Sequence, residues 1–321
     1  MNYEEAVAYI EETPKFTTKN KMEHTKECLK RLGDPQDKFR VIHVAGTNGK
    51  GSTCAFLTSI LREAGYSCGL FTSPHLVVIN ERFQINEKDI SNEVFLDAFC
   101  KVKELADELV KEGNYHPTYF EFLFLMGMVI FADAGVDYVV LETGLGGRLD
   151  ATSATEDPEV CVITSIGLDH MEYLGNTVEQ IAGEKAGIIR PGVPVFYAQS
   201  AEESDRVIEK TAAQLRSSCK KIGKDAYEIL GIEDKHIAFS CTNAYYGTTT
   251  WKLNNIGSYQ PGNALLAMEV MQYLFWEKGH VDRWREALAQ VKWQGRMGAN
   301  LMPMRFSTSA LKTSTPTRSR V

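Results

Sequence analysis

Apolar positions along the chain form short β-branched runs that alternate with longer stretches of helical period. The runs of strand type are residues 41–44, 68–72, 138–143, 160–164 and 193–196. Between them, the spacing of apolar residues predicts helices from Ser91 to Glu112 and from Thr118 to Ala132, the second one buried on a sheet. Repeated strand-turn-helix units are typical of a parallel sheet with right-handed crossovers. We therefore predict an α/β fold in which helices flank a parallel sheet.

The pattern is less regular in three other segments. The first forty residues have the spacing of two amphipathic helices separated by a polar loop. Residues from about Tyr227 to Trp251 contain glycine and asparagine turns and predict small antiparallel strands at the edge of the sheet. The polar segment from Val77 to Lys88 is either a loop over a site or a plain surface excursion.

Residues Val41 to Thr53 read VIHVAGTNGKGST, a strand followed by a glycine-rich loop and the start of a helix. Such a loop directs successive backbone N–H groups toward one point, and Lys50 adds a positive charge, so the segment suits a polyphosphate. The strict P-loop pattern is not met, because Val44 stands at its first glycine and Gly51 follows the lysine. A tight turn with a solvated lysine is the alternative to a variant P-loop.

Polar residues stand where two of the predicted strands end. Ser73 follows the second strand, and Glu142 lies at the end of the apolar run from Tyr138. Ligands of open α/β sheets bind at the carboxyl ends of the strands. An acid at such a strand end beside a P-loop is placed to hold Mg²⁺.

Composition and charge narrow the possible partners. The 321 residues allow one large domain or two smaller ones, and a net charge of −7 argues against a nucleic-acid partner. The seven cysteines form no C-x-x-C pair, as is typical of a reduced cytosolic protein. Acidic residues near the N-terminus argue against a signal peptide, and no apolar run is long enough to span a membrane. We expect a cytoplasmic protein.

Five segments occur in a fixed order along the chain. They are GTNGKGS (46–52), LFTSPHL (70–76), ETGLGGRLDAT (142–152), GLDHMEYLG (167–175) and EKAGIIRPGVP (184–194). Together they resemble folylpolyglutamate synthase/dihydrofolate synthase, within the Mur ligase superfamily. Other Mur ligases share the glycine-lysine loop and the metal-binding acid, but the second and third segments favour the folate branch. The resemblance implies the central-domain fold of the Mur ligases.

The resemblance also implies an activity. Enzymes of this family use ATP to phosphorylate a carboxylate, and the amino group of glutamate then attacks the acyl phosphate. The implied small-molecule substrates are ATP, glutamate and either a reduced folate or dihydropteroate, bound by a monomer. Phosphoryl transfer between two anions is opposed mainly by their negative charge. Cations and backbone N–H donors held in place offset this charge. The residues implied in nucleotide binding are Gly49, Lys50, Gly51, Ser52, Asn263 and Arg296.

Two Mg²⁺ sites follow from the same resemblance. Ser73 and Glu142 would ligate the first ion through oxygen atoms, which suit this hard cation. His170 would ligate the second together with a carbamylated Lys185, because a carbamate binds a cation and an ammonium does not. With Lys50, these two residues are the expected catalytic residues. The alternatives are a capping or core role for His170 and a solvated Lys185 that pairs with a nearby acid.

The likeness ends after Met297, where the family continues with a second α/β domain. Residues 298–321 are rich in Ser, Thr, Lys and Arg and hold no acid, a composition typical of disorder. We expect an ATP-binding domain at 1–297, a disordered and non-native tail at 298–321, and no C-terminal glutamate-ligase domain. A frameshift or premature end of the coding sequence is preferred over a genuine short variant. We expect the truncation to impair the ligase activity of this chain, and an inactive nucleotide- or folate-binding remnant is the alternative function.

Overall fold

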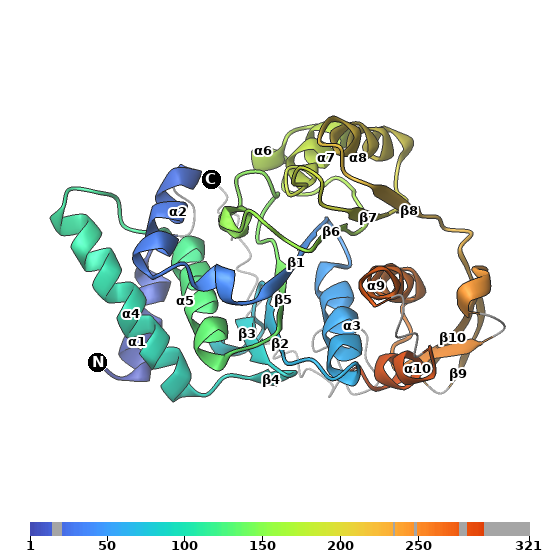
Figure 1. Cartoon of the computed structure of the whole chain (residues 1–321), viewed down its shortest axis with the longest axis horizontal. Helices are drawn as coiled ribbons and strands as arrows, with labels where there is room; N and C mark the ends of the chain where they lie inside the picture. Colours follow the sequence, from blue (N-terminus) through green and yellow to red (C-terminus); the bar gives the residue numbers. More distant parts are fainter. Residues whose placement is uncertain (15–20, 234, 247–248, 276–280, 292–321) are drawn as a thin grey trace, which may run out of the picture.

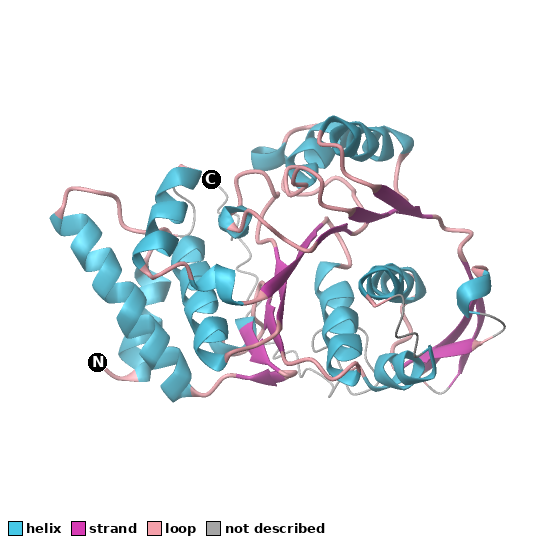
Figure 2. Cartoon of the chain, in the orientation of Figure 1, coloured by secondary structure: helices cyan, strands magenta, loops and turns pink. Residues whose placement is uncertain are grey.

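The computed structural model describes residues 1–14, 21–233, 235–246, 249–275 and 281–291. An eight-stranded sheet runs through the molecule in the order β4-β3-β2-β5-β1-β6-β7-β8 (Figures 1 and 2). All neighbours from β2 to β8 pair in parallel, whereas β3 and β4 add an antiparallel edge. The strands are β1 (Arg40–Ala45), β2 (Cys68–Phe71), β3 (Phe83–Ile85), β4 (Lys88–Asp89), β5 (Tyr138–Glu142), β6 (Val160–Ile163), β7 (Val195–Ala198) and β8 (Cys219–Ile222).

Helices cover both faces of this sheet (Figure 1). One face packs against α1 (Tyr3–Glu12), α2 (Met22–Arg31), α4 (Asn92–Lys111), α5 (Tyr119–Ala134), α7 (Val178–Ala186) and α8 (Glu202–Gln214). The other packs against α3 (Lys50–Glu63), α9 (Gln260–Leu274) and α10 (Val281–Gln290). A one-turn helix, α6 (Met171–Leu174), and four short 3₁₀ turns complete the helical elements of the described chain. None of its helices is long and apolar enough to cross a membrane.

The period-two pattern of the strands explains why both faces are covered. Ile42 and Val44 of β1 point to the core under α3 and α9, while Val41 and Ala45 contact the opposite layer. Strands that are buried on both sides need apolar residues at every position, as parallel strands between two helix layers do. The predicted α/β fold with a parallel sheet is thereby confirmed.

Two irregular segments took more definite forms than their sequences indicated. The predicted antiparallel strands form a sheet of their own, β11-β10-β9, from β9 (Tyr227–Glu233), β10 (His236–Cys241) and β11 (Thr250–Leu253). Phe239 and Trp251 stack between this sheet and the helices α9 and α10. The segment 77–88 is not wholly a loop, because buried Phe83 brings β3 into the main sheet beside β2.

Candidate functional site

The glycine-rich loop between β1 and α3 has a backbone that only glycine adopts without strain. Gly46 has φ +148° and Gly49 has φ +90°, and Gly49 is the residue before α3 begins at Lys50. A Cβ on Gly46 would lie 1.8 Å from the Thr164 hydroxyl oxygen, and one on Gly49 would lie 2.4 Å from Oδ1 of Asn263. The loop is therefore closed in by β6 on one side and by α9 on the other.

Hydrogen bonds fasten the same loop to the residues that follow β6. The amides of Thr47 and Asn48 donate to the Ser165 carbonyl at 2.9 and 3.3 Å. The Thr47 hydroxyl donates to the Gly167 carbonyl and accepts from the Gly167 amide, both at 3.2 Å. A loop held by two neighbouring strands offers its free N–H groups in a fixed direction, as an anion site requires.

Two lysines converge on a single carbonyl oxygen of this loop. Nζ of Lys50 donates to the Gly46 carbonyl at 3.0 Å, and Nζ of Lys185, from α7, donates to the same oxygen at 2.8 Å. Lys50 is half-buried and Lys185 is 3% exposed. Two ammonium groups in one place repel each other unless an anion joins them, so the arrangement favours a phosphate.

The surroundings of Lys185 determine its charge. Burial and, to a smaller extent, the nearby Lys50 lower the pKa of its amine to about 8, although Asp169 and Asp150 oppose the shift. Glu184, the acid next to Lys185 in the sequence, instead accepts from Arg148 at 2.8 Å. The alternative of a solvated Lys185 is therefore not supported, because α7 directs this side chain inward to the glycine-rich loop.

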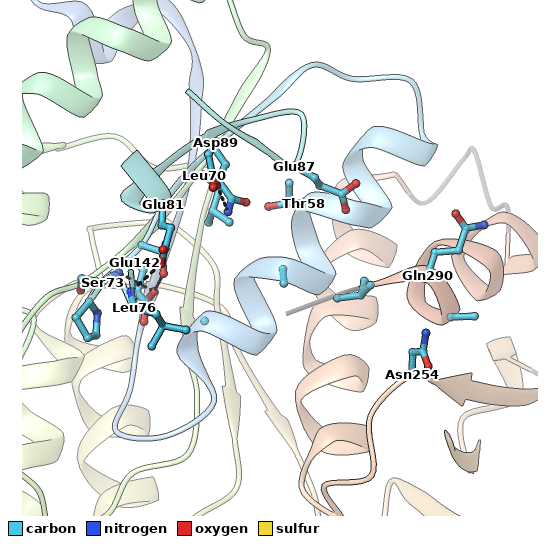
Figure 3. A pocket seen from close by; sticks show the side chains of 17 residues that line it. Thr58, Leu70, Ser73, Leu76, Glu81, Glu87, Asp89, Glu142, Asn254 and Gln290 are labelled. Atoms are coloured by element: carbon cyan, nitrogen blue, oxygen red, sulfur yellow. Dashed lines mark hydrogen bonds between the residues drawn. The ribbon is translucent and has the colours of Figure 1, made fainter. Parts of the chain in front are cut away.

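Glu142 stands at the end of β5 with an almost buried carboxylate, 2% exposed. The Thr72 hydroxyl donates to its Oε2, and the Ser73 amide donates to the same atom at 3.3 Å. These three residues and Gly51 line a cavity of about 850 Å³, in which Ser73 and Glu142 lie side by side (Figure 3). The Glu142 carboxylate with the Thr72 hydroxyl bonded to it and the Ser73 side chain beside it offers oxygen donors, which fit Mg²⁺.

Ser52 and Asn263 are linked by a residue that the sequence analysis did not single out. Gln260 opens α9 and donates from Nε2 to the Ser52 hydroxyl at 3.1 Å, while its Oε1 accepts from Asn263 Nδ2 at 3.1 Å. All three side chains are buried. The Ser52 hydroxyl is therefore bonded to α9, and no sequence pattern indicated this link, because it depends on a contact between two helices 208 residues apart.

A carboxylate also organises the loop after β5. Asp150 accepts from the amides of Gly144 and Leu145 and from the Thr152 hydroxyl, at 3.1, 2.8 and 2.6 Å. The imidazole of His43 on β1, fully buried, contacts that hydroxyl at 2.9 Å. Burial lowers the pKa of His43 to about 3, so the ring stays neutral. Asp150 thus shapes the 144–150 loop that packs on α7 near Lys185.

The remaining predicted residues are less closely grouped. His170 precedes α6 with φ +47°, and its exposed ring lies 3.7 Å from Asp169. Groups of three or more His, Cys, Asp or Glu side chains able to hold a metal do not occur in the described ranges, so the second Mg²⁺ site stays a prediction. Arg296 and the tail 298–321 lie outside the described residues.

Comparison with known proteins gives matches along most of the chain. The Mur ligase middle domain family matches residues 44–271. The dihydrofolate synthase/folylpolyglutamate synthase of Bacillus subtilis is 39% identical over 303 residues, covering 92% of this chain and 70% of that protein. A folylpolyglutamate synthase of Arabidopsis thaliana is 46% identical over 222 residues, covering 66% and 39% respectively. A solved FPGS–AMPPCP–folate complex has a TM-score of 0.82 at 29% identity, covering 91% of this chain and 72% of that one.

Proposed function

The chain belongs to the Mur ligase family, in its folylpolyglutamate synthase/dihydrofolate synthase branch, and on this premise we propose that it is an ATP-dependent ligase that adds glutamate to folates. A structural neighbour that holds AMPPCP and folate supports the two substrate classes, and the double name of the Bacillus subtilis relative supports dihydropteroate as a second acyl substrate. The chain spans 70% and 39% of the length of the two curated relatives described above. The activity of those whole proteins is therefore a proposal for this chain.

One observation carries the proposal: the side-chain nitrogens of Lys50 and Lys185 meet at the Gly46 carbonyl, beside the N-terminus of α3. Backbone N–H groups at the start of α3 and the Lys50 ammonium at one point form a site for a triphosphate. The Glu142 carboxylate is on the neighbouring strand β5, which pairs with β1. Phosphoryl transfer between anions requires this combination of donors and positive charge.

We assign the steps to residues of the chain as follows. Lys50 and the amides of the loop hold the phosphates of ATP, and Lys50 balances the negative charge that moves with the γ-phosphoryl group. The substrate carboxylate accepts this group to give an acyl phosphate. The glutamate amine then attacks the acyl carbon, which forms the amide bond and releases phosphate.

The proposal also includes Mg²⁺ and a carbamate formed from CO₂, neither of which is part of the polypeptide. Glu142 and Ser73 would hold one Mg²⁺, which when bound neutralises phosphate charge. Lys185 has a lowered pKa, so part of its amine is neutral near pH 8 and can add CO₂ to give a carbamate. His170 would join that carbamate at a second ion.

A binding experiment with Glu142→Ala tests the nucleotide site. The variant should lose the Mg²⁺-dependent part of ATP affinity while metal-free affinity stays within about twofold, because a single carboxylate ligand is removed. Isothermal titration of ATP with and without Mg²⁺ gives both numbers. Glu159→Ala, an exposed acid that pairs with Arg40 at the other end of the sheet, is the control. Equal losses with and without the ion would contradict the assignment of Glu142.

Turnover separates the ligase from the second candidate, an inactive nucleotide- or folate-binding protein. The chain is incubated with ATP, Mg²⁺, tetrahydrofolate and glutamate, and the diglutamate product is measured by mass spectrometry. Product that disappears in Lys50→Ala supports the ligase. Nucleotide binding without product favours the second candidate.

A further inference from the structure

Residues 73–81 form a loop whose two ends are joined. The Thr72 amide donates to the Arg82 carbonyl at 3.1 Å, where β2 ends and β3 begins. Arg82 is buried and donates from Nε to Nδ1 of His75 at 2.9 Å. The first residue of the loop, Ser73, is the one whose amide bonds to Glu142. The conformation of the loop therefore sets where Ser73 lies.

A single carboxylate holds the middle of this loop. The amides of Leu76, Val77 and Val78 donate to Glu81 at 2.7, 2.9 and 2.9 Å. Three consecutive backbone donors on one side chain form an anion nest. Partial burial would raise the pKa of the Glu81 carboxyl, but the three amide bonds outweigh it and the pKa is lowered.

Apolar burial does not hold the same three residues. The side chains of Leu76, Val77 and Val78 are 57%, 80% and 46% exposed, although all three are aliphatic. Their backbone amides bond to Glu81, and their side chains are exposed, that of Leu76 along the cavity. Ile79 and Asn80 are the buried side chains of the loop, so the 76–78 part has mainly its hydrogen bonds to Glu81 to offset the entropy of ordering it.

The loop and the metal-binding residues share one wall of the cavity. Glu81, Leu76, Ser73 and Glu142 cluster at one end of it, whereas Glu87 lies apart beside Thr58 (Figure 3). We propose that Glu81 is a positioning residue, whose carboxylate fixes the 73–81 loop and thereby holds Ser73 beside Glu142 in readiness for Mg²⁺. The inference has a structural half, that Glu81 orders the 73–81 loop, and a functional half, that the ordered loop places Ser73 for Mg²⁺. Only the functional half rests on the proposed function.

Amide hydrogen exchange on the chain without nucleotide tests the structural half. In Glu81→Gln, exchange at Leu76, Val77 and Val78 should speed up at least about tenfold, while amides of β1 and β5 keep their rates. Glu87→Gln is the matched control, because Glu87 pairs with the Arg62 side chain and accepts from no amide of the loop. Unchanged exchange at the three residues in Glu81→Gln would overturn the proposal.

Binding of a non-hydrolysable ATP analogue tests the functional half. Glu81→Gln should reduce the gain in affinity that Mg²⁺ gives by about fivefold or more and leave metal-free affinity unchanged. Loss of both affinities, or of neither, would overturn the role of Glu81 at Ser73. Glu81→Asp keeps the charge on a shorter side chain and should fall between wild type and Glu81→Gln in both measurements, which provides a second variant should the glutamine one fail to fold. If Mg²⁺ does not raise the affinity of the wild-type chain for the analogue, the proposed function is overturned, whatever the exchange rates.

Discussion

At the scale of single residues, Gly46 shows how little room the phosphate loop has. Its φ of +148° is a conformation that L side chains rarely adopt, and the Thr164 hydroxyl fills the space that a Cβ would need. The sequence indicated a glycine-rich turn here. It did not indicate which strand closes the loop, because Thr164 is more than a hundred residues away.

Substitution of Gly46 by alanine should displace the loop and abolish nucleotide binding. We expect a loss of about 2–4 kcal/mol in the free energy of unfolding, from strain and overpacking together. Gly33→Ala is the control, since Gly33 also has a positive φ, +82°, but open space around it. It should cost only about 1 kcal/mol and leave ATP binding intact. Urea unfolding and calorimetric titration of both variants decide the matter, and similar behaviour of the two would contradict the steric account.

Lys185 should carry a stability penalty that depends on pH. Its pKa falls from an ordinary 10.5 to about 8 on folding, so below pH 8 the folded chain bears a buried charge that the unfolded chain solvates. In CO₂-free buffer, Lys185→Met should therefore stabilise the protein at pH 7 by up to about 3 kcal/mol. Stability of the wild type rises with pH between 8 and 10.5, so the difference should shrink to below about 1 kcal/mol at pH 10.

Thermal unfolding of both proteins at pH 7 and pH 10 measures this difference. A gain that is equal at the two pH values would show that packing, not charge, explains it. The prediction also separates stability from function, because the more stable variant should bind ATP more weakly. The sequence left a solvated Lys185 open as the alternative to a carbamate, and the orientation of α7, which buries this side chain against the sheet, argues against that alternative.

At the scale of elements, α9 supports α3 through the Gln260 side chain. Gln260 satisfies the buried Ser52 hydroxyl and, through Asn263, reaches Gly49. The two helices also share the core that contains Leu57, Ile60 and Leu265. The phosphate loop is therefore set by two helices, one of which comes late in the sequence.

Gln260→Leu should destabilise the protein by about 2–4 kcal/mol, because it leaves the Ser52 hydroxyl and the Asn263 amide buried without this partner. Adding Ser52→Ala to the variant should recover at least about 1 kcal/mol, since the orphaned hydroxyl is then gone. Urea unfolding of the wild type, both single variants and the double variant completes the cycle. Additive effects would contradict a direct coupling between the two side chains.

The elements that the sequence predicted well are those with long periodic patterns. The helices at 92–111 and 119–134 and the strands β1, β5 and β6 fall within a few residues of their predicted ranges. β4 and β8 were not predicted, because Lys88–Asp89 and Cys219–Ile222 are short and mostly exposed. Edge strands lack the apolar face from which a strand is recognised. Their pairing comes from the neighbouring strand, which the local sequence does not encode.

At the scale of the whole molecule, the site is an assembly of strand ends. Gly46 follows β1, Ser73 follows β2, Glu142 ends β5, and Ser165 follows β6, so parallel alignment brings four distant segments to one edge of the sheet. The sequence predicted most of these residues from their strand-end positions. It could not predict Thr72 or Gln260, whose roles depend on contacts across the sheet and between helices.

The position of β1 between β5 and β6 also bears on how the protein is made. The bonds from the phosphate loop and α3 to Gly167, Lys185 and Gln260 span 120, 139 and 208 residues. Closing such long loops costs entropy before the contact repays it, and long-range pairing slows folding. On the ribosome, the GTNGKGS segment is synthesised early but receives its last support only when α9 emerges. A nascent chain should therefore gain affinity for ATP abruptly and late, so that nucleotide binding reports a finished domain and not merely a translated motif.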